Sequence, residues 1–313
     1  MLLSFFERLL RKGKNGVKGA YRRIKLLCIR SSIDCSILTE MQTLDRMITT
    51  ECSVARLGDG EFNMIIRGED IGYQKADGEL SGELRSVLSS GSEELLVCIP
   101  HPIKWTRGYT KGAGAFWDRW LLRNGAQVRA LLKDTVTQGY CFGDTQVSRP
   151  YMDRKEHTLA SVVFQRFKEL WRDKDVIIVE GTHTRLGVGN DMLADAKSVK
   201  RILCPAVDAF CCRSRILEAV KTIHSNELVL LALGPTATVL ALDLTRIGIR
   251  AIDIGHLDIE YEWFIKGDTK KTAVCGKYVN ELAHGRDVSS VCSDEKYLSQ
   301  IVGSIQPDLD MDA

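Results

Sequence analysis

Two unbroken runs of branched apolar residues constrain the fold of this chain more than any other sequence feature. Val176–Val179 and Leu228–Leu231 consist only of valine, isoleucine and leucine, with no alternation between apolar and polar side chains. A strand with one solvated face alternates, whereas a parallel strand covered by helices on both faces is apolar throughout. The runs therefore predict an α/β fold in which a Rossmann-like, doubly wound and mostly parallel sheet lies between two layers of helices.

Strand-like runs alternate with helical spacing along most of the chain. The expected strands are Ser53–Leu57, Glu94–Ile99, Thr137–Phe142, Asp175–Val179, Arg201–Cys204, Leu228–Leu233 and Arg250–Ile254. With 313 residues, of which 44% are hydrophobic, the chain can bury the core of one large domain. We expect that domain over residues 34–285, between an arm at residues 1–33 and a polar tail at residues 286–313.

One strand, helix, strand unit can be assigned in detail. Gly234 ends the run Leu228–Leu233, and Pro235 follows where the first turn of a helix tolerates proline. The expected helix continues to Arg246, and the next strand ends at Ile254. The two strands should lie parallel and be joined by a right-handed crossover.

The charges are balanced over the whole chain but segregated at its start. Lysine and arginine total 43 against 41 acidic residues, and the net charge of +2 gives no bulk attraction to nucleic acid. Before Asp34 there is a single acid, Glu7, and the basic residues are Arg8, Arg11, Lys12, Lys14, Lys18, Arg22, Arg23, Lys25 and Arg30. The apolar stretch that begins this amphipathic arm is too short to cross a bilayer, which needs about 20 residues.

The arm has two interpretations. Residues 1–30 are either an interfacial tether to the anionic inner face of the cell membrane or a solvated, basic leading helix. A secretory signal places its charges before its apolar run, and the order here is reversed. We therefore expect a cytoplasmic protein, with the solvated helix as the first interpretation of the arm and peripheral contact with the inner face of the cell membrane as the second.

Open α/β sheets bind ligands at the carboxyl ends of their strands, where helix N-termini and loop amides converge. Two glycine-bearing turns, Arg185–Asp191 and Gly234–Thr238, follow expected strands and offer donors to a phosphate. The candidate nucleotide-binding residues are Arg56, Asp59, Arg149, Arg185, Gly187, Gly189, Asn190, Asp191, Gly234, Thr236 and Thr238. Because the full GxGxxG fingerprint is absent, either turn could hold a pyrophosphate, or both are only tight turns.

Two acid-x-acid segments also follow expected strands. Asp59 and Glu61 come after the first strand, and Asp258 and Glu260 come after the last. On an extended segment alternate residues point the same way, so each pair could aim two carboxylates at one point. Oxygen ligands of this kind suit Mg²⁺ or Mn²⁺, which would bridge a diphosphate. The pattern does not decide which pair holds the metal.

The last of these segments also contains the candidate catalytic residues. His256 precedes the acids, and Glu262 shares the parity of Asp258 and Glu260. We expect Glu262 to act as the base that deprotonates an acceptor hydroxyl, His256 to contact the donor diphosphate or sugar, and Glu260 to contact the metal or donor. A turn after Gly255 would break this register.

Six blocks, in order between about residues 50 and 265, resemble the bacterial glycosyltransferases of the GT-D fold, once catalogued as a conserved domain of unknown function. The blocks are Arg56–Phe62, Ser148–Tyr151, Gly187–Asp191, Cys204–Ala206, Leu233–Thr238 and Asp253–Trp263. The resemblance implies a metal-dependent transferase that moves a hexose, typically glucose from UDP-glucose, to a glycan or lipid-linked glycan acceptor. It places the chain in the assembly of a surface polysaccharide or a glycoprotein glycan.

Two other functions use the same features differently. Another nucleotide-using Rossmann-like enzyme, such as a methyltransferase or a sugar-nucleotide-modifying enzyme, shares the architecture, but a methyltransferase would not need paired acids for a metal-bound diphosphate. A noncatalytic scaffold recruited to the membrane by its arm would gain nothing from carboxylates clustered at strand ends, because like charges repel one another.

Overall fold

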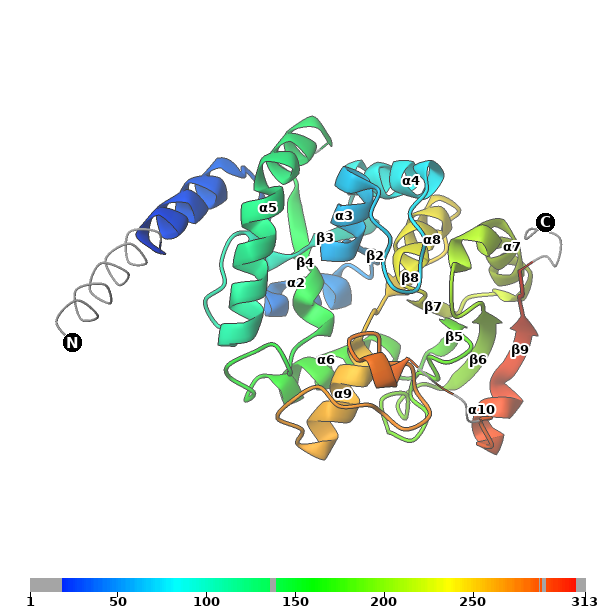
Figure 1. Ribbon diagram of the computed structural model, residues 1–313. Coiled ribbons are helices and arrows are strands. Elements are labelled where there is room, and N and C mark those ends of the chain that lie inside the picture. The colour runs from blue at the N-terminus through cyan, green and yellow to red at the C-terminus, as the bar shows by residue number, and fades with distance from the viewer. Residues whose placement is uncertain (1–18, 136–138, 287, 289–290, 308–313) are drawn as a thin grey trace.

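The computed structural model describes residues 19–135, 139–286, 288 and 291–307, and within them the predicted parallel sheet is confirmed. Nine strands, all parallel to their neighbours, lie in the order β1-β4-β3-β2-β8-β7-β5-β6-β9 (Figure 1). Their bounds are β1 Ser36–Ile37, β2 Ser53–Arg56, β3 Leu95–Ile99, β4 Cys141–Asp144, β5 Asp175–Gly181, β6 Ser198–Cys204, β7 Leu228–Ala232, β8 Ala251–Asp253 and β9 Ile301–Ser304.

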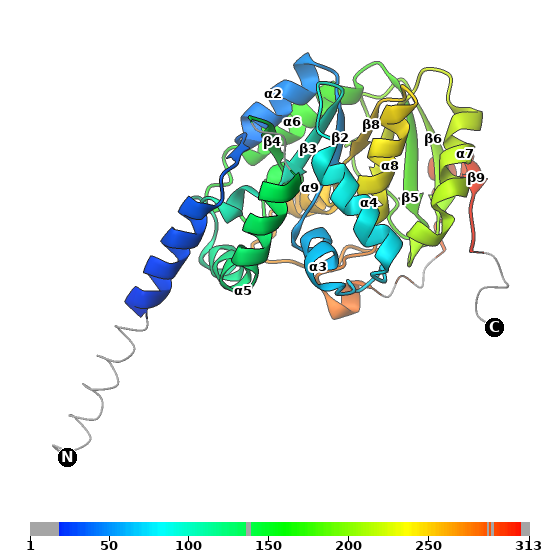
Figure 2. The same cartoon turned by 90° about the horizontal axis from the view of Figure 1, so that it is seen from above.

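Helices cover both faces of the sheet (Figure 2). On one face lie α3 (Asp59–Arg67), α4 (Gly78–Ser89), α5 (Lys111–Thr135), α7 (Arg213–Ile223) and α8 (Pro235–Arg246). On the other lie α2 (Glu40–Thr49), α6 (Ala160–Trp171) and α9 (Leu257–Lys266). The remaining elements are α10 (Glu295–Gln300) and the short 3₁₀ turns η1 (His101–Ile103), η2 (Thr145–Ser148), η3 (Ala209–Cys212) and η4 (Ala283–Gly285).

The unbroken apolar runs supply both cores, as their composition predicts. Ile177 and Val179 of β5 belong to the core on the α8 face, whereas Val176 and Ile178 belong to the core on the α9 face. Successive side chains of a strand point to opposite faces, so a run with two covered faces has no polar position. Helix α8 packs across β2, β7 and β8, and every residue from Pro235 to Leu244 is buried.

All seven expected strands are present, and the β7-α8-β8 unit has the predicted parallel geometry. Two starts differ by more than one residue: β6 begins at Ser198, before the expected Arg201, and β4 begins at Cys141, after the expected Thr137, which lies outside the described residues. The sheet also extends past residue 285, where we expected the domain to end, because β9 pairs with β6 at the sheet edge. This part of the polar tail is therefore built into the fold.

Residues 19–32 of the basic arm form a helix that projects from the body beside α5 (Figure 1). Its end is anchored, because Leu26 is buried and Arg30 forms a 2.7 Å ion pair with Asp118 of α5. Residues 1–18, which contain the amphipathic stretch of the sequence, lie outside the described residues.

A buried ion pair fastens the C-terminal elements to the sheet. Nη1 of Arg201 in β6 lies 2.5 Å from a carboxylate oxygen of Glu180 in β5, and both side chains are almost completely buried. The same guanidinium donates to Gln300 at 2.8 Å and lies over the ring of Tyr297, both in α10. Arg201 therefore links β5, β6 and α10.

Replacing Arg201 with methionine should lower the free energy of unfolding by about 3–5 kcal/mol, because Glu180 would remain buried without its cation. The matched control is Lys197→Met, which breaks the 2.9 Å pair between the residue that precedes β6 and Asp175 of β5; both side chains of this pair are more than a third exposed. That variant should cost no more than about 1 kcal/mol. Urea unfolding measures both, and equal losses would show that the buried pair has no special role.

Candidate active site at the carboxyl ends of the strands

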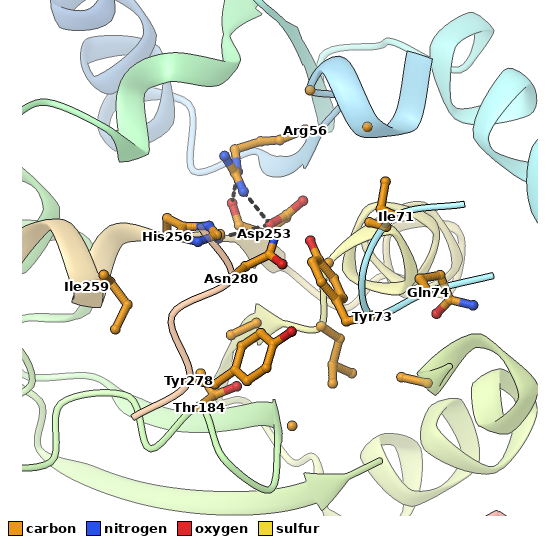
Figure 3. A pocket seen from close by; sticks show the side chains of 18 of the residues that line it. Arg56, Ile71, Tyr73, Gln74, Thr184, Asp253, His256, Ile259, Tyr278 and Asn280 are labelled. Carbon is orange, nitrogen blue, oxygen red and sulfur yellow. Dashed lines mark hydrogen bonds and ion pairs between the residues drawn. The ribbon is translucent and has the colours of Figure 1, made fainter. Parts of the chain in front are cut away.

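A pocket of about 260 Å³ opens where β2, β8, β7, β5 and β6 end. It lies at the edge of the sheet where parallel strands present their carboxyl ends, as the fold predicts. Of the residues expected from the sequence, those that line it are Arg56, Asp59, Glu61, Arg149, Gly234, His256 and Asp258. Figure 3 shows part of this lining, with Arg56 and His256 on one side and two tyrosines on another.

The guanidinium of Arg56 is hydrogen-bonded to other protein groups and is therefore not free to bind an anion. Its Nε and Nη2 donate to the carbonyl and carboxylate oxygens of Asp253, at 2.8 and 2.9 Å (Figure 3). Its Nη1 donates to Ser148 Oγ at 2.7 Å and to the carbonyl oxygen of Thr145. A Cβ atom at Gly255, whose φ is +50°, would lie 1.7 Å from this guanidinium, so only glycine fits there.

Three helices begin at the pocket. The residues that precede α3, α8 and α9 are Gly58, Gly234 and His256, and all three line it. The first N–H groups of a helix have no partner within the helix, and the aligned peptide dipoles place partial positive charge there. The three N-termini therefore make this end of the sheet attractive to an anion.

Asp59 and Glu61 lie in the first turn of α3, not on an extended segment as we expected. Residues two apart on a helix point in nearly opposite directions, so the two carboxylates do not converge. Glu61 accepts a 2.7 Å hydrogen bond from the N–H of Gly58 and so caps its own helix. Burial raises the pKa of Glu61 to about 7. Burial also raises the pKa of Asp59, although Arg149 opposes that rise.

The acids of the last segment likewise lie on a helix, α9. The prediction that Asp258, Glu260 and Glu262 share one face is therefore wrong. Asp258 and Glu262, four residues apart, lie on the same face of α9 and share the ammonium group of Lys277, at 2.7 and 2.9 Å. Glu262 does not line the pocket. Burial tends to raise its pKa, but Lys277 and the amide of Asn190 outweigh burial, and the pKa is lowered.

Glu260 points away from Asp258 and Glu262, and it does not line the pocket either. One of its carboxylate oxygens accepts hydrogen bonds from the N–H groups of Tyr151 and Met152, at 3.1 and 2.8 Å. Burial raises its pKa to about 7, against the opposing charge of Arg149. Glu260 therefore supports the backbone after Arg149 instead of contacting the pocket.

The turn Arg185–Asp191 does not open a helix, and Leu186 is its one residue that lines the pocket. Its donors bind neighbouring structure: the N–H of Gly187 and the amide of Asn190 contact Asp258, at 3.0 and 2.9 Å. Arg185 donates to the carbonyl oxygen of Gly276 at 2.8 Å, and Gly189 lies between these contacts in the chain. Asp191 forms a 2.8 Å ion pair with Lys168. The turn holds α9 and the segment after it, so its donors are not directed at a phosphate.

In the other glycine-bearing turn, Gly234–Thr238, Gly234 lines the pocket, whereas Thr236 and Thr238 do not. The hydroxyl of Thr236 donates to Gln74 at 3.3 Å. The hydroxyl of Thr238 donates to the carbonyl oxygen of Arg56 at 2.8 Å. Both threonines are fully buried and position α8 against its neighbours.

A segment that the sequence analysis did not include completes the site. Residues 272–286, called the strap below, follow α9 and bring Tyr278 and Asn280 to the pocket. Glu281 of the strap lies 2.6 Å from Nη1 of Arg149 and 3.0 Å from Nε2 of His256. Although burial opposes ionisation, these two groups hold the pKa of Glu281 well below its usual range. No motif marks the strap, because its position depends on contacts with residues far away in the sequence.

The surroundings of His256 determine its charge and which of its two ring nitrogens carries the proton. Burial, with the nearby charge of Arg149, lowers the pKa of His256 below its ordinary value of 6.5. Since the ionised Glu281 can only accept a hydrogen bond, the neutral imidazole carries its proton on Nε2. Nδ1 is then the nitrogen with a free lone pair and the one able to accept a proton.

Within the described part of the chain, no group of three or more histidine, cysteine, aspartate or glutamate side chains is arranged to hold a metal ion. The four expected ligands are dispersed: Glu61 caps α3, Asp258 pairs with Lys277, and Glu260 binds backbone N–H groups. Asp59 lines the pocket near the charge of Arg149 and has no ion pair within the described residues. Mg²⁺ commonly binds through one or two carboxylates together with substrate phosphates and waters, and Asp59 fits that kind of site.

The glycosyltransferase GT-D fold family model matches residues 54–282. The chain belongs to this family. It is similar to the probable glycosyl transferase Gly of Streptococcus gordonii, with 39% identity over 271 residues, 86% of this chain and 39% of that protein. It is also similar to the glycosyltransferase GlyD of Streptococcus pneumoniae serotype 4, with 37% identity over 265 residues, 84% of this chain and 32% of that protein.

Solved structures of GT-D relatives match over nearly their whole length. A structure described as a new glycosyltransferase from Streptococcus sanguinis is 38% identical, with a TM-score of 0.81, and covers 87% of this chain and 100% of its own. Another, described as having a distinct glycosyltransferase fold, is 34% identical, also with a TM-score of 0.81, over 89% of this chain and 98% of its own. The chain is thus a glycosyltransferase of the GT-D family that spans less than half the length of the two streptococcal relatives it matches in sequence.

Proposed function

We propose that this GT-D glycosyltransferase transfers a hexose, with glucose as the leading candidate, from a UDP-sugar to a hydroxyl of a glycan. The proposed setting is the assembly of a surface polysaccharide or a glycoprotein glycan. The observation that carries the proposal is a pocket at which three helices begin, with Arg149, His256 and the aromatic side chains of Tyr73 and Tyr278 in its lining. Such a pocket suits a ligand with a diphosphate at one end and a planar base at the other.

Family membership weighs against the two alternatives. A methyltransferase, a sugar-nucleotide-modifying enzyme and a scaffold all fail to account for a match of 34–39% identity to proteins described as glycosyltransferases. A scaffold would also have no use for ionisable groups gathered in the lining of one pocket, because removing charges from water costs free energy.

We assign the donor diphosphate to the N-termini of α3, α8 and α9, close to Arg149. Asp59 is the proposed protein ligand of Mg²⁺ or Mn²⁺, together with the diphosphate itself. When bound, the cation supplies charge neutralisation for the departing diphosphate. Arg149, held by Glu281 at 2.6 Å, keeps a fixed guanidinium beside the same position.

His256 is the proposed base, because among the expected catalytic residues it lines the pocket while Glu262 and Glu260 do not. Glu281 fixes the ring through Nε2, so that Nδ1 can accept the proton of the acceptor hydroxyl as the new glycosidic bond forms. The resulting imidazolium is stabilised by the ionised Glu281 that it already contacts. Glu281 is a positioning residue in this proposal.

The projecting helix at residues 19–32 supports a peripheral role at an anionic membrane. Tyr21, Ile24 and Leu27 are each more than 60% exposed and recur every three residues. The helix contains Arg22, Arg23, Lys25 and Arg30 and no acidic residue. No helix in the described ranges is long and apolar enough to cross a membrane. We propose that this helix brings the enzyme to a lipid-linked acceptor on the inner face of the cell membrane.

Removing the divalent metal should weaken UDP binding at least about tenfold, or about 1.4 kcal/mol, because no cation would then neutralise the diphosphate beside Asp59. Isothermal titration with UDP, with Mn²⁺ or with a chelator, measures the effect. In Asp59→Asn the affinity should already be low with Mn²⁺ and change little on chelation. Asp45→Asn, on the exposed side of α2, is the control and should behave as the wild type. Equal UDP affinity of the wild type with and without metal would contradict the proposed metal site.

Replacing His256 with asparagine should lower kcat by about 10²-fold or more while leaving UDP affinity nearly unchanged. Because the base must be deprotonated and its pKa is lowered by burial, wild-type kcat/KM should rise with pH through a pKa below 6.5. His224→Asn, at the far end of α7, is the matched control. The assignment is wrong if His256→Asn keeps normal turnover while Glu262→Gln abolishes turnover with donor binding intact.

Replacing Tyr21, Ile24 and Leu27 together with serine should reduce binding to phosphatidylserine-containing vesicles more than about tenfold, because it removes the apolar area that would enter the interface. Leu159→Ser, which removes a 56% exposed leucine from the body of the protein, should leave vesicle binding unchanged. Co-sedimentation at low and high salt provides the measurement. The tether is refuted if the triple variant sediments as well as the wild type.

A further inference from the structure

The pocket has two chemically different ends. Arg56, Asp253 and His256 lie at the ends of β2 and β8, together with Asp59 and Arg149. At the ends of β7, β5 and β6 the lining is mostly apolar and small, with Leu233, Gly181, Pro205, Ala206 and Ala209, and its polar side chains are His183 and Thr184. Three strand spacings separate β8 from β6, roughly 14 Å at about 4.8 Å per spacing.

Two tyrosines from distant parts of the chain stand over the apolar end. The rings of Tyr73 and Tyr278 meet edge to face, with centroids 6.2 Å apart and planes 79° apart. Figure 3 shows both side chains pointing into the pocket, Tyr73 from the turn after α3 and Tyr278 from the strap. Within the described residues, neither hydroxyl has a hydrogen bond to another protein group.

The Tyr73 ring is held in place by its surroundings. Its turn is closed by two hydrogen bonds between the backbones of Ile71 and Gln74, at 3.0 and 3.1 Å. The carbonyl oxygen of Tyr73 accepts from the N–H of Asp208 at 3.0 Å. A Cβ atom at Gly234 would lie 2.4 Å from the Tyr73 ring, so the ring rests directly on the backbone that begins α8.

Tyr278 is held equally firmly. Its N–H donates to the carbonyl oxygen of His183 at 2.9 Å. The preceding residue, Lys277, is buried and bound to both Asp258 and Glu262. Both rings are therefore positioned before any ligand binds, which lowers the entropic cost of recognition.

We infer that Tyr73 and Tyr278, with the apolar residues at the ends of β7, β5 and β6, form the subsite for the nucleobase of the donor. The inference rests on the proposed nucleotide-sugar donor. A neutral planar heterocycle gains from contact with an aromatic ring and from apolar burial, whereas a diphosphate would gain nothing there. The two free hydroxyls are available to the heteroatoms of the base or to the ribose.

Three probes separate the two ends of the pocket: uridine, UDP and inorganic pyrophosphate, each titrated in the presence of Mn²⁺. Tyr278→Leu and Tyr73→Leu should each weaken uridine and UDP by the same factor, about tenfold, and leave pyrophosphate unchanged. Arg149→Gln should weaken UDP and pyrophosphate but not uridine. Phe116→Leu, which changes a 40% exposed aromatic ring of α5 outside the pocket, is the matched control.

Saturation-transfer NMR on the unmodified protein gives a second measurement that needs no variant. The uracil protons of UDP should receive more saturation than the ribose protons, because the base lies against the aromatic rings. The inference is overturned if the ribose protons receive more, or if both leucine variants bind UDP as the wild type does. Wild-type protein that binds none of the three probes would overturn the proposed donor as well, whereas normal UDP binding by the variants overturns the subsite alone.

Discussion

The candidate active site depends on one buried guanidinium at the junction between the two halves of the sheet. Strands β2 and β8 meet there with a single registered pair in the described residues, Val54 with Ile252, so few backbone hydrogen bonds join them. Arg56 makes the connection instead, through Asp253 on β8 and Ser148 on η2. Because buried charges are stable only when paired and fully hydrogen-bonded, this cluster permits one arrangement, and the starts of α3, α8 and α9 are fixed with it.

The strap is the second element on which the site depends, and it is held by charges at two points. Lys277 is bound by two acids of α9, and Glu281 is bound by Arg149 and His256. Between these points the strap presents Tyr278 and Asn280 to the pocket. The anchors explain why several acids near the site are not free for chemistry: Asp258 and Glu262 hold in place the segment that forms one wall.

The sequence was enough to predict the parallel sheet, its seven main strands and the edge at which polar residues gather. Apolar runs bounded by glycine or proline carry that information locally, as Val176–Val179 shows. The direction of each side chain was not predictable in the same way. Asp258, Glu260 and Glu262 share a face on a strand but not on a helix, and the choice between the two depends on packing against α6 and the strap. Glu281 and Tyr278 carry no local signal, since each depends on a partner more than 90 residues away, Arg149 for Glu281 and His183 for Tyr278.

Carboxylates already neutralise the arginines of the pocket, which affects how the pocket could bind the proposed anionic donor. Arg56 is neutralised by Asp253 and Arg149 by Glu281, at 2.9 and 2.6 Å. Asp59 and Glu61 have no such partner among the ion pairs of the described residues, but Glu61 is bound to the N–H of Gly58, so the lining offers the proposed diphosphate the carboxylate of Asp59 and three helix N-termini. Partial charges of about half a unit per helix end attract the diphosphate, but Asp59 repels it. A divalent cation between the two would turn that repulsion into a bridge, and a proton on Asp59 would only remove it. The balance of charges therefore supports a cation-dependent donor site more strongly than a site built on helix termini alone.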